Sequence, residues 1–260
     1  MIELVGRYTL DVAETLGSVA KMTHRSMLAI ARGQWVPKLS IAQMNEIGVA
    51  SFPVVGLTSL FTGMVLAFQS GYSFMKVFNE PIYVGSVVGL SLVKELGPVL
   101  TAMVIAGRVG AAITAELGTM NVTEQLDALY TLGTNPIRYL AVPRYIAMMI
   151  MTPILSFLAD IIGIFGGYVV ATLELKIPGG TYWEEVRTFV EMNDVMHGIV
   201  KAFFFGMIIV TTSCYVGFNT SGGAEGVGRA TTRAVVISMV LILVGDYFLS
   251  ALLVALGIGG

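Results

Sequence analysis

The sequence predicts an all-α integral membrane protein, from its composition and from the length of its apolar runs. Of the 260 residues, 55% are hydrophobic and only 12% are charged, whereas an ordinary soluble domain carries about 25% charged residues. A soluble fold of this length could not bury so much apolar surface, but a bilayer solvates it directly. The chain also contains five apolar runs long enough to cross a bilayer, for which a helix needs about 20 residues.

The N-terminal region, residues 1–45, is expected to lie along the membrane surface. Apolar side chains recur at helical spacing from Val5 to Ile30, and the basic residues lie largely off that stripe. This pattern is typical of an amphipathic interfacial helix, although a helix packed on a soluble partner would show it too. Pro37 is expected to end this helix.

The five apolar runs are the expected spans. They cover residues 47–68, 82–117, 145–173, 198–218 and 234–256. The second run is too long for one straight span and is interrupted at residues 94–98, Lys-Glu-Leu-Gly-Pro. It predicts either one long helix kinked at Pro98 or a re-entrant segment followed by a span. We favour a single crossing, because the distribution of charge is then consistent.

The connecting segments are predicted from their polar, Pro and Gly residues. We expect a loop over residues 69–81, a polar segment over 174–195 with a short helix at 181–192, and a Gly-rich loop over 219–232. No internal repeat or low-complexity tract interrupts the sequence. Residues 1–260 are therefore expected to form a single transmembrane domain.

Basic residues predict the orientation, because cytoplasmic loops are enriched in Lys and Arg. Five crossings place the two ends on opposite sides. One side carries Arg7, Lys21, Arg25, Arg32, Lys38, Arg108, Arg138, Arg144, Arg229 and Arg233, whereas the other carries only Lys76, Lys176 and Arg187. The N-terminus is therefore expected in the cytoplasm and the C-terminus outside.

The cytoplasmic segment 119–143 is expected to contain a short helix over residues 124–132. Thr123 is a plausible N-cap, Gly133 suits the C-terminal cap, and Pro136 prevents further propagation. The helix would have an acidic start and an apolar edge, which a soluble partner with a groove could bind. It could equally be a connecting helix that rests on its own bundle. The candidate contact residues are Glu124, Gln125, Leu126, Asp127, Ala128, Leu129 and Leu132.

Ionisable residues within the apolar runs are the other candidates for function. Such groups are costly in a membrane and usually face a cavity or pair with one another. Glu95 is the best candidate for a cavity-lining residue because it stands beside the expected helix break, and a buried ion pair is the alternative. Asp160 and Asp246 could relay protons or could be structural partners of Arg108, Lys201 or the backbone. Arg108 and Glu116 belong to the same group of intramembrane charges.

Two further patterns have a structural and a functional interpretation. Small residues at helical spacing, such as Gly107 and Ala111, predict tight helix packing. Arg229 and Arg233 stand one helical turn apart before the fifth run. They could hold a lipid phosphate, dock a partner, or only anchor the topology.

The sequence lacks the motifs of several enzyme classes. It contains no GxxxxGK[ST] phosphate loop, no HExxH, no GxSxG and no Cys/His cluster. We therefore expect no enzyme activity, no bound metal and no cofactor in this chain, and no basic patch suggests nucleic acid. An ion-coupled secondary transporter remains an alternative, although the odd number of spans and the absence of an inverted repeat weigh against it. A membrane scaffold without transport is a third possibility.

Two stretches resemble the MlaE/YrbE-type permeases of phospholipid-transporting ABC systems. They are residues 94–144, from KELGPVL to LAVPR, and residues 226–236, GVGRATTRAVV, followed by Gly245-Asp246. The resemblance implies a homodimer in the bacterial inner membrane, bound to a dimer of cytoplasmic ATPases that hold ATP and Mg²⁺. It also implies a periplasmic substrate-binding protein of the mammalian-cell-entry (MCE) type, and often a small STAS-domain protein. The implied cargo is phospholipid, moved between inner and outer membranes to maintain outer-membrane lipid asymmetry.

The resemblance also implies roles for particular residues. The helix over 124–132 looks like the coupling helix that sits in the ATPase groove. Gln125 and Leu126 stand where the importer pattern has two alanines, so this chain departs from that pattern. The polar pair Lys94 and Glu95, with the neighbouring Gly97 and Pro98, would belong to a lipid pocket at the dimer interface that opens outward.

Overall fold

The computed structural model describes residues 2–34, 36–78 and 83–259, and the side chains of these residues except 2–9, 11, 12 and 78. Within these ranges the regular structure is entirely helical, so the predicted all-α membrane class is confirmed. Five helical segments of the described chain are long and apolar enough to cross a membrane. They are Pro37–Val77, Val84–Val122, Ile137–Leu173, Met192–Phe218 and Gly223–Ala255.

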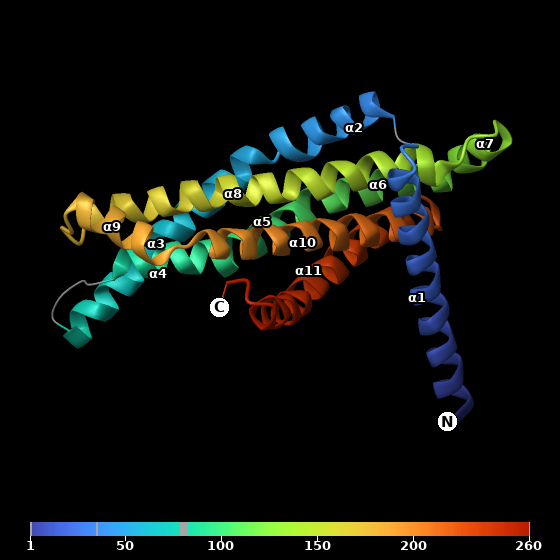
Figure 1. Cartoon of the computed structure of the whole chain (residues 1–260). Helices are drawn as coiled ribbons and strands as arrows, with labels where there is room; N and C mark the ends of the chain where they lie inside the picture. Colours follow the sequence, from blue (N-terminus) through green and yellow to red (C-terminus); the bar gives the residue numbers. More distant parts are fainter. Residues whose placement is uncertain (1, 35, 79–82, 260) are drawn as a thin grey trace.

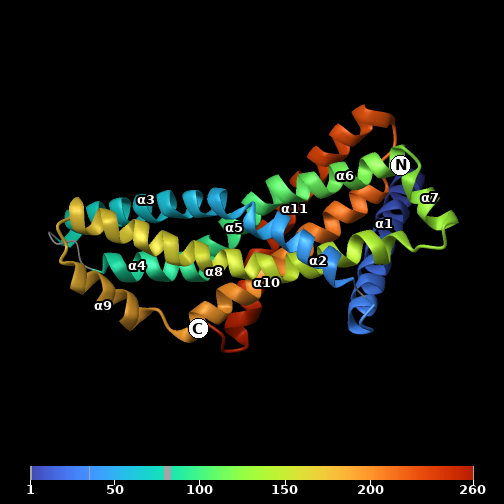
Figure 2. The same ribbon diagram turned by 90° about the horizontal axis from the view of Figure 1, so that it is seen from above.

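The five segments form an elongated bundle, with α9 (Gly179–Phe189) at one end and α7 (Gln125–Thr131) at the other (Figures 1 and 2). Helix α8 (Val142–Leu173) lies near the centre, where it packs against α3 (Phe52–Phe78) and α10 (Met192–Phe218). Helix α10 also packs against α11 (Gly223–Ala255). Helix α1 (Ile2–Ala31) meets one end of the bundle and runs across the bundle axis (Figure 1).

The first span begins earlier and ends later than predicted. Helix α2 (Pro37–Met44) continues through a π-helical turn, Asn45–Val49, and α3 follows after a two-residue break. Pro37 therefore opens a helix rather than ending one, because the first helical turn needs no N–H donor. Helix α1 already ends at Ala31, where Gly33 adopts a φ of +66°. Residues 69–78 of the predicted loop are helical, and residues 79–82 lie outside the described chain.

The C-terminal half of α1 contacts the bundle through its apolar side. Met22 is only 7% exposed, and Met27 and Ile30 pack against the same core. The predicted stripe begins at Val5, whose side chain lies outside the described residues.

The second span is one continuous helical segment, so the favoured single crossing is confirmed. It consists of α4 (Val84–Ser91), α5 (Gly97–Ile105) and α6 (Ala111–Val122), joined by π-helical turns at Leu92–Leu96 and Ala106–Gly110. The expected break at residues 94–98 is the first of these turns. A π-helical turn absorbs an extra residue without ending the helix, and such turns often mark functional sites.

The remaining elements depart from their predicted bounds for local reasons. Helix α7 (Gln125–Thr131) and a π-helical turn, Ile137–Ala141, precede α8. Helix α9 (Gly179–Phe189) begins and ends earlier than the predicted range of residues 181–192. Helix α10 begins at Met192 because Glu191 and Asp194 form a capping box. The predicted Gly-rich loop 219–232 is mostly the start of α11. Gly222, with a φ of +90°, supplies the turn into that helix.

Helices α3 and α8 approach each other closely through glycines. A Cβ atom at position 63 would lie 1.8 Å from the carbonyl oxygen of Gly163, and one at position 166 would lie 2.3 Å from that of Leu60. The hydroxyl of Ser59 also donates to the carbonyl of Ala159. By contrast, the predicted tight position Gly107 is only in ordinary contact with Met239, at 3.7 Å. Other small residues of the same segment do pack tightly, since a Cβ atom at position 110 would lie 3.0 Å from Ser213 Oγ of α10. Small residues therefore bring together both pairs of helices, α3 with α8 and the second span with α10.

We expect Gly63→Ala to destabilise the bundle by about 1–3 kcal/mol, because the added methyl group meets backbone atoms that cannot rotate away. Thermal unfolding of the detergent-solubilised protein measures this effect. Gly17→Ala is the matched control, since the space around Gly17 is open. Equal unfolding temperatures for the two variants would show that α3 and α8 separate at little cost.

Helix α9 is fixed to the bundle at the end opposite α7. Tyr182 is fully buried, and its hydroxyl donates to the carbonyl of Ile164 over 3.0 Å. Burial, and then the charge of Glu185, raise the pKa of Tyr182 above its ordinary value, so this hydroxyl stays protonated and remains a donor. The Glu185 carboxylate accepts from the backbone N–H of Gly85 over 2.7 Å, at the start of α4.

Candidate functional site

A polar cluster inside the bundle is built around Lys201 of α10, whose side chain is fully buried. Its ammonium lies 2.5 Å from Glu95 Oε2 and 2.5 Å from Asp246 Oδ1. It also donates to Ser250 Oγ over 2.9 Å and to the carbonyl oxygen of Lys94 over 3.2 Å. The cluster therefore joins the second span, α10 and α11.

Local sequence explains why a backbone carbonyl is available to Lys201. The carbonyl of Lys94 would ordinarily accept from the N–H four residues later, but that residue is Pro98, which has none. The π-helical turn Leu92–Leu96 shifts the neighbouring bond as well, because Gly97 N–H donates to Leu92. The proline four residues after Lys94 is a signal that sequence reasoning could have used.

Further ionisable groups extend the cluster along α10. Lys94 Nζ lies 3.1 Å from Asp194 Oδ1, and His197 Nε2 lies 4.0 Å from Glu95 Oε1. Asp194, His197 and Lys201 share one face of α10, because their spacing of three and four residues matches the helical period. On α11, Asp246 and Ser250 are four residues apart and share a face in the same way.

The cluster is buried at its centre and open at its edge. Lys201 is fully buried, whereas the side chains of Glu95, Lys94 and Asp246 are 44%, 28% and 23% exposed. A buried ammonium requires compensating charge, which the two carboxylates supply. The partly exposed side chains of Lys94, Glu95 and Asp246 present both signs of charge at the surface of the bundle.

Gly97 and Pro98, the other two pocket candidates, are buried inside the helix packing. A Cβ atom at position 97 would lie 1.7 Å from Asp160 Oδ1, and a Cβ at position 198 would lie 3.3 Å from the ring of Pro98. Asp160 is only 7% exposed, and its Oδ1 has no hydrogen-bond partner among the described residues. The glycine thus makes room for a carboxylate that pairs with neither Arg108 nor Lys201.

Arg108, predicted as an intramembrane charge, and Arg144, counted only on the cytoplasmic side, both lie within spanning segments. Arg108 sits in the π-helical turn Ala106–Gly110 and donates to Ser51 Oγ over 2.6 Å. Arg144 is 3% exposed in α8 and lies 2.6 Å from Glu116 Oε2. The paired carboxylate and the Ser51 hydroxyl explain how these guanidinium groups are accommodated.

Helix α7 is shorter than predicted and begins differently. Thr123 does not cap it, because the Thr123 hydroxyl donates back to the carbonyl of Thr119 over 2.8 Å. Glu124 precedes the helix with a φ of +61°, in the left-handed region. Gly133, with a φ of +72°, ends the turn that follows, as predicted. A glutamate backbone in the left-handed region is uncommon, and here it forms a defined bend between α6 and α7.

The expected apolar edge of α7 is divided between the bundle and the surface. Leu126 is 6% exposed and Leu129 packs partly against the core, whereas Leu132 is 78% exposed. Tyr130, which the sequence analysis did not single out, is 59% exposed. The remaining candidates are exposed as well: Glu124, Gln125, Asp127 and Ala128. The helix extends beyond the end of the bundle (Figure 1), so these side chains form an accessible surface.

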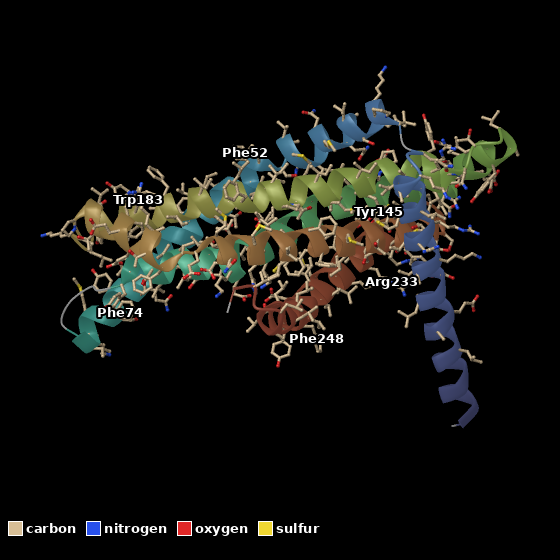
Figure 3. All side chains as sticks on the ribbon, in the orientation of Figure 1. Phe52, Phe74, Tyr145, Trp183, Arg233 and Phe248 are labelled. Atoms are coloured by element: carbon tan, nitrogen blue, oxygen red, sulfur yellow. The ribbon has the colours of Figure 1, made fainter. Side chains whose placement is uncertain are left out.

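Arg229 and Arg233 lie on the first turns of α11, close to α1. Arg229 Nη1 lies 2.5 Å from Glu225 Oε1, and both side chains are exposed. Figure 3 shows Arg233 where α11 passes α1. Both arginines line a hollow at the same end of the molecule as α7.

These features define a multi-pass α-helical membrane protein with an intramembrane ionic cluster and a helix that extends from one end. Residues 40–252 match the sequence model of the family described as Permease MlaE. The chain belongs to this family of ABC transporter permeases and is a transport component rather than an enzyme.

Three relatives illustrate the extent of the similarity. A "probable ABC transporter permease protein" of Rickettsia typhi is 45% identical over 96% of both chains. A protein of the same description from Synechocystis is 43% identical over 89% of this chain and 88% of its own length. The Haemophilus influenzae "intermembrane phospholipid transport system permease protein MlaE" is 35% identical over 98% of both chains.

Proposed function

We propose that the chain is the membrane-spanning permease of an ABC transporter that moves phospholipids between the inner and outer membranes and thereby maintains outer-membrane lipid asymmetry. The observation that carries this proposal is the similarity, over 98% of both chains, to the Haemophilus protein named for intermembrane phospholipid transport. Phospholipid is therefore the proposed cargo.

The proposed assembly contains two copies of this chain in the bacterial inner membrane, with the N-terminus in the cytoplasm. A dimer of cytoplasmic ATPases, which hold ATP and Mg²⁺, would bind the two α7 helices. The exposed Tyr130 and Leu132 support this role, since apolar side chains on a protruding helix suit a partner's groove. An MCE-type protein on the periplasmic side and a STAS-domain protein on the cytoplasmic side complete the proposed complex.

The proposed mechanism uses the second span as a mechanical link. The helical segment Val84–Val122 is uninterrupted and carries Glu95 in one half. Its other end leads directly into α7 through the bend at Glu124. A rigid helical element can transmit a displacement over such a distance. Movement of α7 on ATP binding would therefore shift Glu95 against Lys201 and alter the open edge of the cluster, where the lipid headgroup is proposed to bind.

Purification of the native complex, followed by reconstitution into proteoliposomes, tests the proposal. Mass spectrometry identifies the subunits and bound lipids, and transfer of a labelled phospholipid to acceptor vesicles measures transport. We expect an associated ATPase and transfer that requires ATP. A complex without an ATPase, or transfer driven by a proton or sodium gradient alone, would instead favour an ion-coupled secondary transporter.

A further inference from the structure

A hollow of about 220 Å³ lies where the end of α1 meets the start of the third span. Three arginines line it: Arg25 and Arg32 from α1, and Arg138 from the π-helical turn that leads into α8. Among the described residues that line this hollow, none is acidic. The hollow shares no lining residue with the ionic cluster or with the hollow at Arg229. It therefore gathers positive charge at a separate place on the molecule.

The hollow lies at the level of the lipid headgroups. The first spanning segment begins at Pro37 and the third at Ile137, which itself lines the hollow. The third segment has 37 residues and would measure about 55 Å at 1.5 Å per residue, whereas a bilayer with its headgroups is about 40–45 Å thick. The start of a segment centred in the bilayer therefore lies at the outer edge of one headgroup layer. Helix α1 crosses the bundle at this same end (Figure 1).

The three arginines have donors available for an anion. Arg25 and Arg32 are seven residues apart and share one face of α1. Both are exposed, and neither forms a hydrogen bond or an ion pair through its side chain with a described residue. The side chain of Arg138 uses its Nε, which donates to the carbonyl oxygen of Gln34 over 3.2 Å. A guanidinium group has five N–H donors, so those on the two terminal nitrogens of Arg138 remain.

The oxygen atoms around the hollow already have donors. The backbone N–H of Gln34 donates to the carbonyl of Ala29 over 2.9 Å, where α1 ends. The side-chain oxygen of Asn135 accepts from the backbone N–H of Ile137 over 3.0 Å, at the start of the third span. Since these acceptors are occupied and the guanidinium donors are available, the hollow favours a ligand that is rich in acceptors and negatively charged. A phosphate group has both properties, and arginine binds it through charge-assisted hydrogen bonds.

Exposed apolar side chains flank the hollow. Val36 is 41% exposed, and Ile41, one turn into the first span, is 64% exposed. Tyr139 follows Arg138 directly and is 43% exposed. Tyrosine is enriched at the level of the headgroups, because its ring is apolar and its hydroxyl is polar. A ligand with a phosphate and hydrocarbon chains can contact both the arginines and these side chains, whereas free phosphate cannot.

We propose that this hollow binds the phosphate of an anionic phospholipid from the leaflet at the α7 end of the bundle, with an acyl chain beside Tyr139. Basic pockets between membrane helices are a known means of binding anionic headgroups. The bound lipid would join α1 to the start of α8. This site would hold a lipid of the surrounding leaflet, so it goes beyond the proposed transport function and does not depend on it.

The test places a photoreactive group beside the hollow. In the full chain, p-benzoyl-phenylalanine replaces Tyr139, which is a conservative change of one aromatic side chain for another. The chain is irradiated in nanodiscs with equal amounts of phosphatidylglycerol and phosphatidylcholine, and mass spectrometry measures the ratio of the two lipid adducts. We expect phosphatidylglycerol adducts to predominate. Adding Arg25→Gln and Arg32→Gln should lower the ratio about tenfold, because two cations at the membrane surface are lost.

Lys21→Gln/Lys38→Gln is the matched control. Both lysines are exposed near the same end of the bundle and the pair loses the same charge, but neither lysine lines the hollow. The control should therefore keep the high ratio of phosphatidylglycerol adducts. Because Arg25 and Arg32 are exposed, we expect the unfolding temperature of the double arginine variant to equal that of the control.

Three outcomes would overturn the proposal. Equal adduct ratios in the double arginine variant and the lysine control would mean that the arginines only anchor the topology. Loss of the lipid preference on addition of soluble glycerol phosphate would identify a site for free phosphate. In the native complex, adducts with an associated protein in place of lipid would show that a protein partner covers the hollow. Because the readout is the adduct ratio, failed lipid transport would leave the result unaffected.

Discussion

Lys201→Met is expected to abolish ATP-dependent lipid transfer and to lower the stability of the bundle. The substitution leaves Glu95 and Asp246, each 2.5 Å from the lost ammonium, without their cation. Breaking a buried pair costs roughly 3–5 kcal/mol, and we expect about 3 kcal/mol here because Glu95 is partly exposed. Thermal unfolding in detergent and lipid transfer by the reconstituted complex measure the two effects.

A triple variant separates the structural role of this cluster from a functional one. Lys201→Met combined with Glu95→Gln and Asp246→Asn removes every charge in its centre, so most of the lost stability should return. If the cluster contacts cargo or moves during transport, transfer should remain low in the triple variant. Recovery of both stability and transfer would show that the ion pairs serve only to hold the three helices together.

Asp127→Lys is expected to reduce ATP-driven transfer about tenfold or more while unfolding is unchanged. Asp127 is exposed on α7, so the reversed charge meets only solvent or a partner. Charge reversal at a complementary interface commonly costs several kcal/mol of binding free energy. Co-purification with the ATPase, ATP hydrolysis and lipid transfer are the three measurements.

Glu184→Lys is the control for Asp127→Lys, because Glu184 is exposed on α9 at the opposite end and undergoes the same change of charge. Leu126→Asp serves as a second comparison. Leu126 is buried under α7, so that variant should lose stability as well as coupling. Normal transfer by Asp127→Lys, with the ATPase still bound, would contradict a contact at this residue.

The candidate residues illustrate how far sequence could lead. Charge within an apolar run identified Glu95 and Asp246, because ionised groups in a membrane are costly wherever they lie. Sequence named Lys201 among the possible partners of Asp246, a pair that the structure contains. It could neither choose between the alternatives nor connect Glu95 to Lys201, since that connection spans 106 residues and depends on how three helices pack. The local prediction that Thr123 caps α7 was wrong. A bend at Glu124 let the Thr123 hydroxyl bond backwards, and local propensity does not specify such a bend.

By itself, the sequence determined the membrane class, the all-α fold, the five spans and the helical character of the segment before α8. Apolar length and composition suffice for these, because a bilayer imposes the same requirement on every segment that crosses it. The tertiary structure alone decided the close contact of α3 with α8, the pairing of Arg144 with Glu116, and the hollow beside Arg233. Each depends on atoms brought together from distant parts of the chain, where distance and orientation set the energy and sequence spacing carries no information.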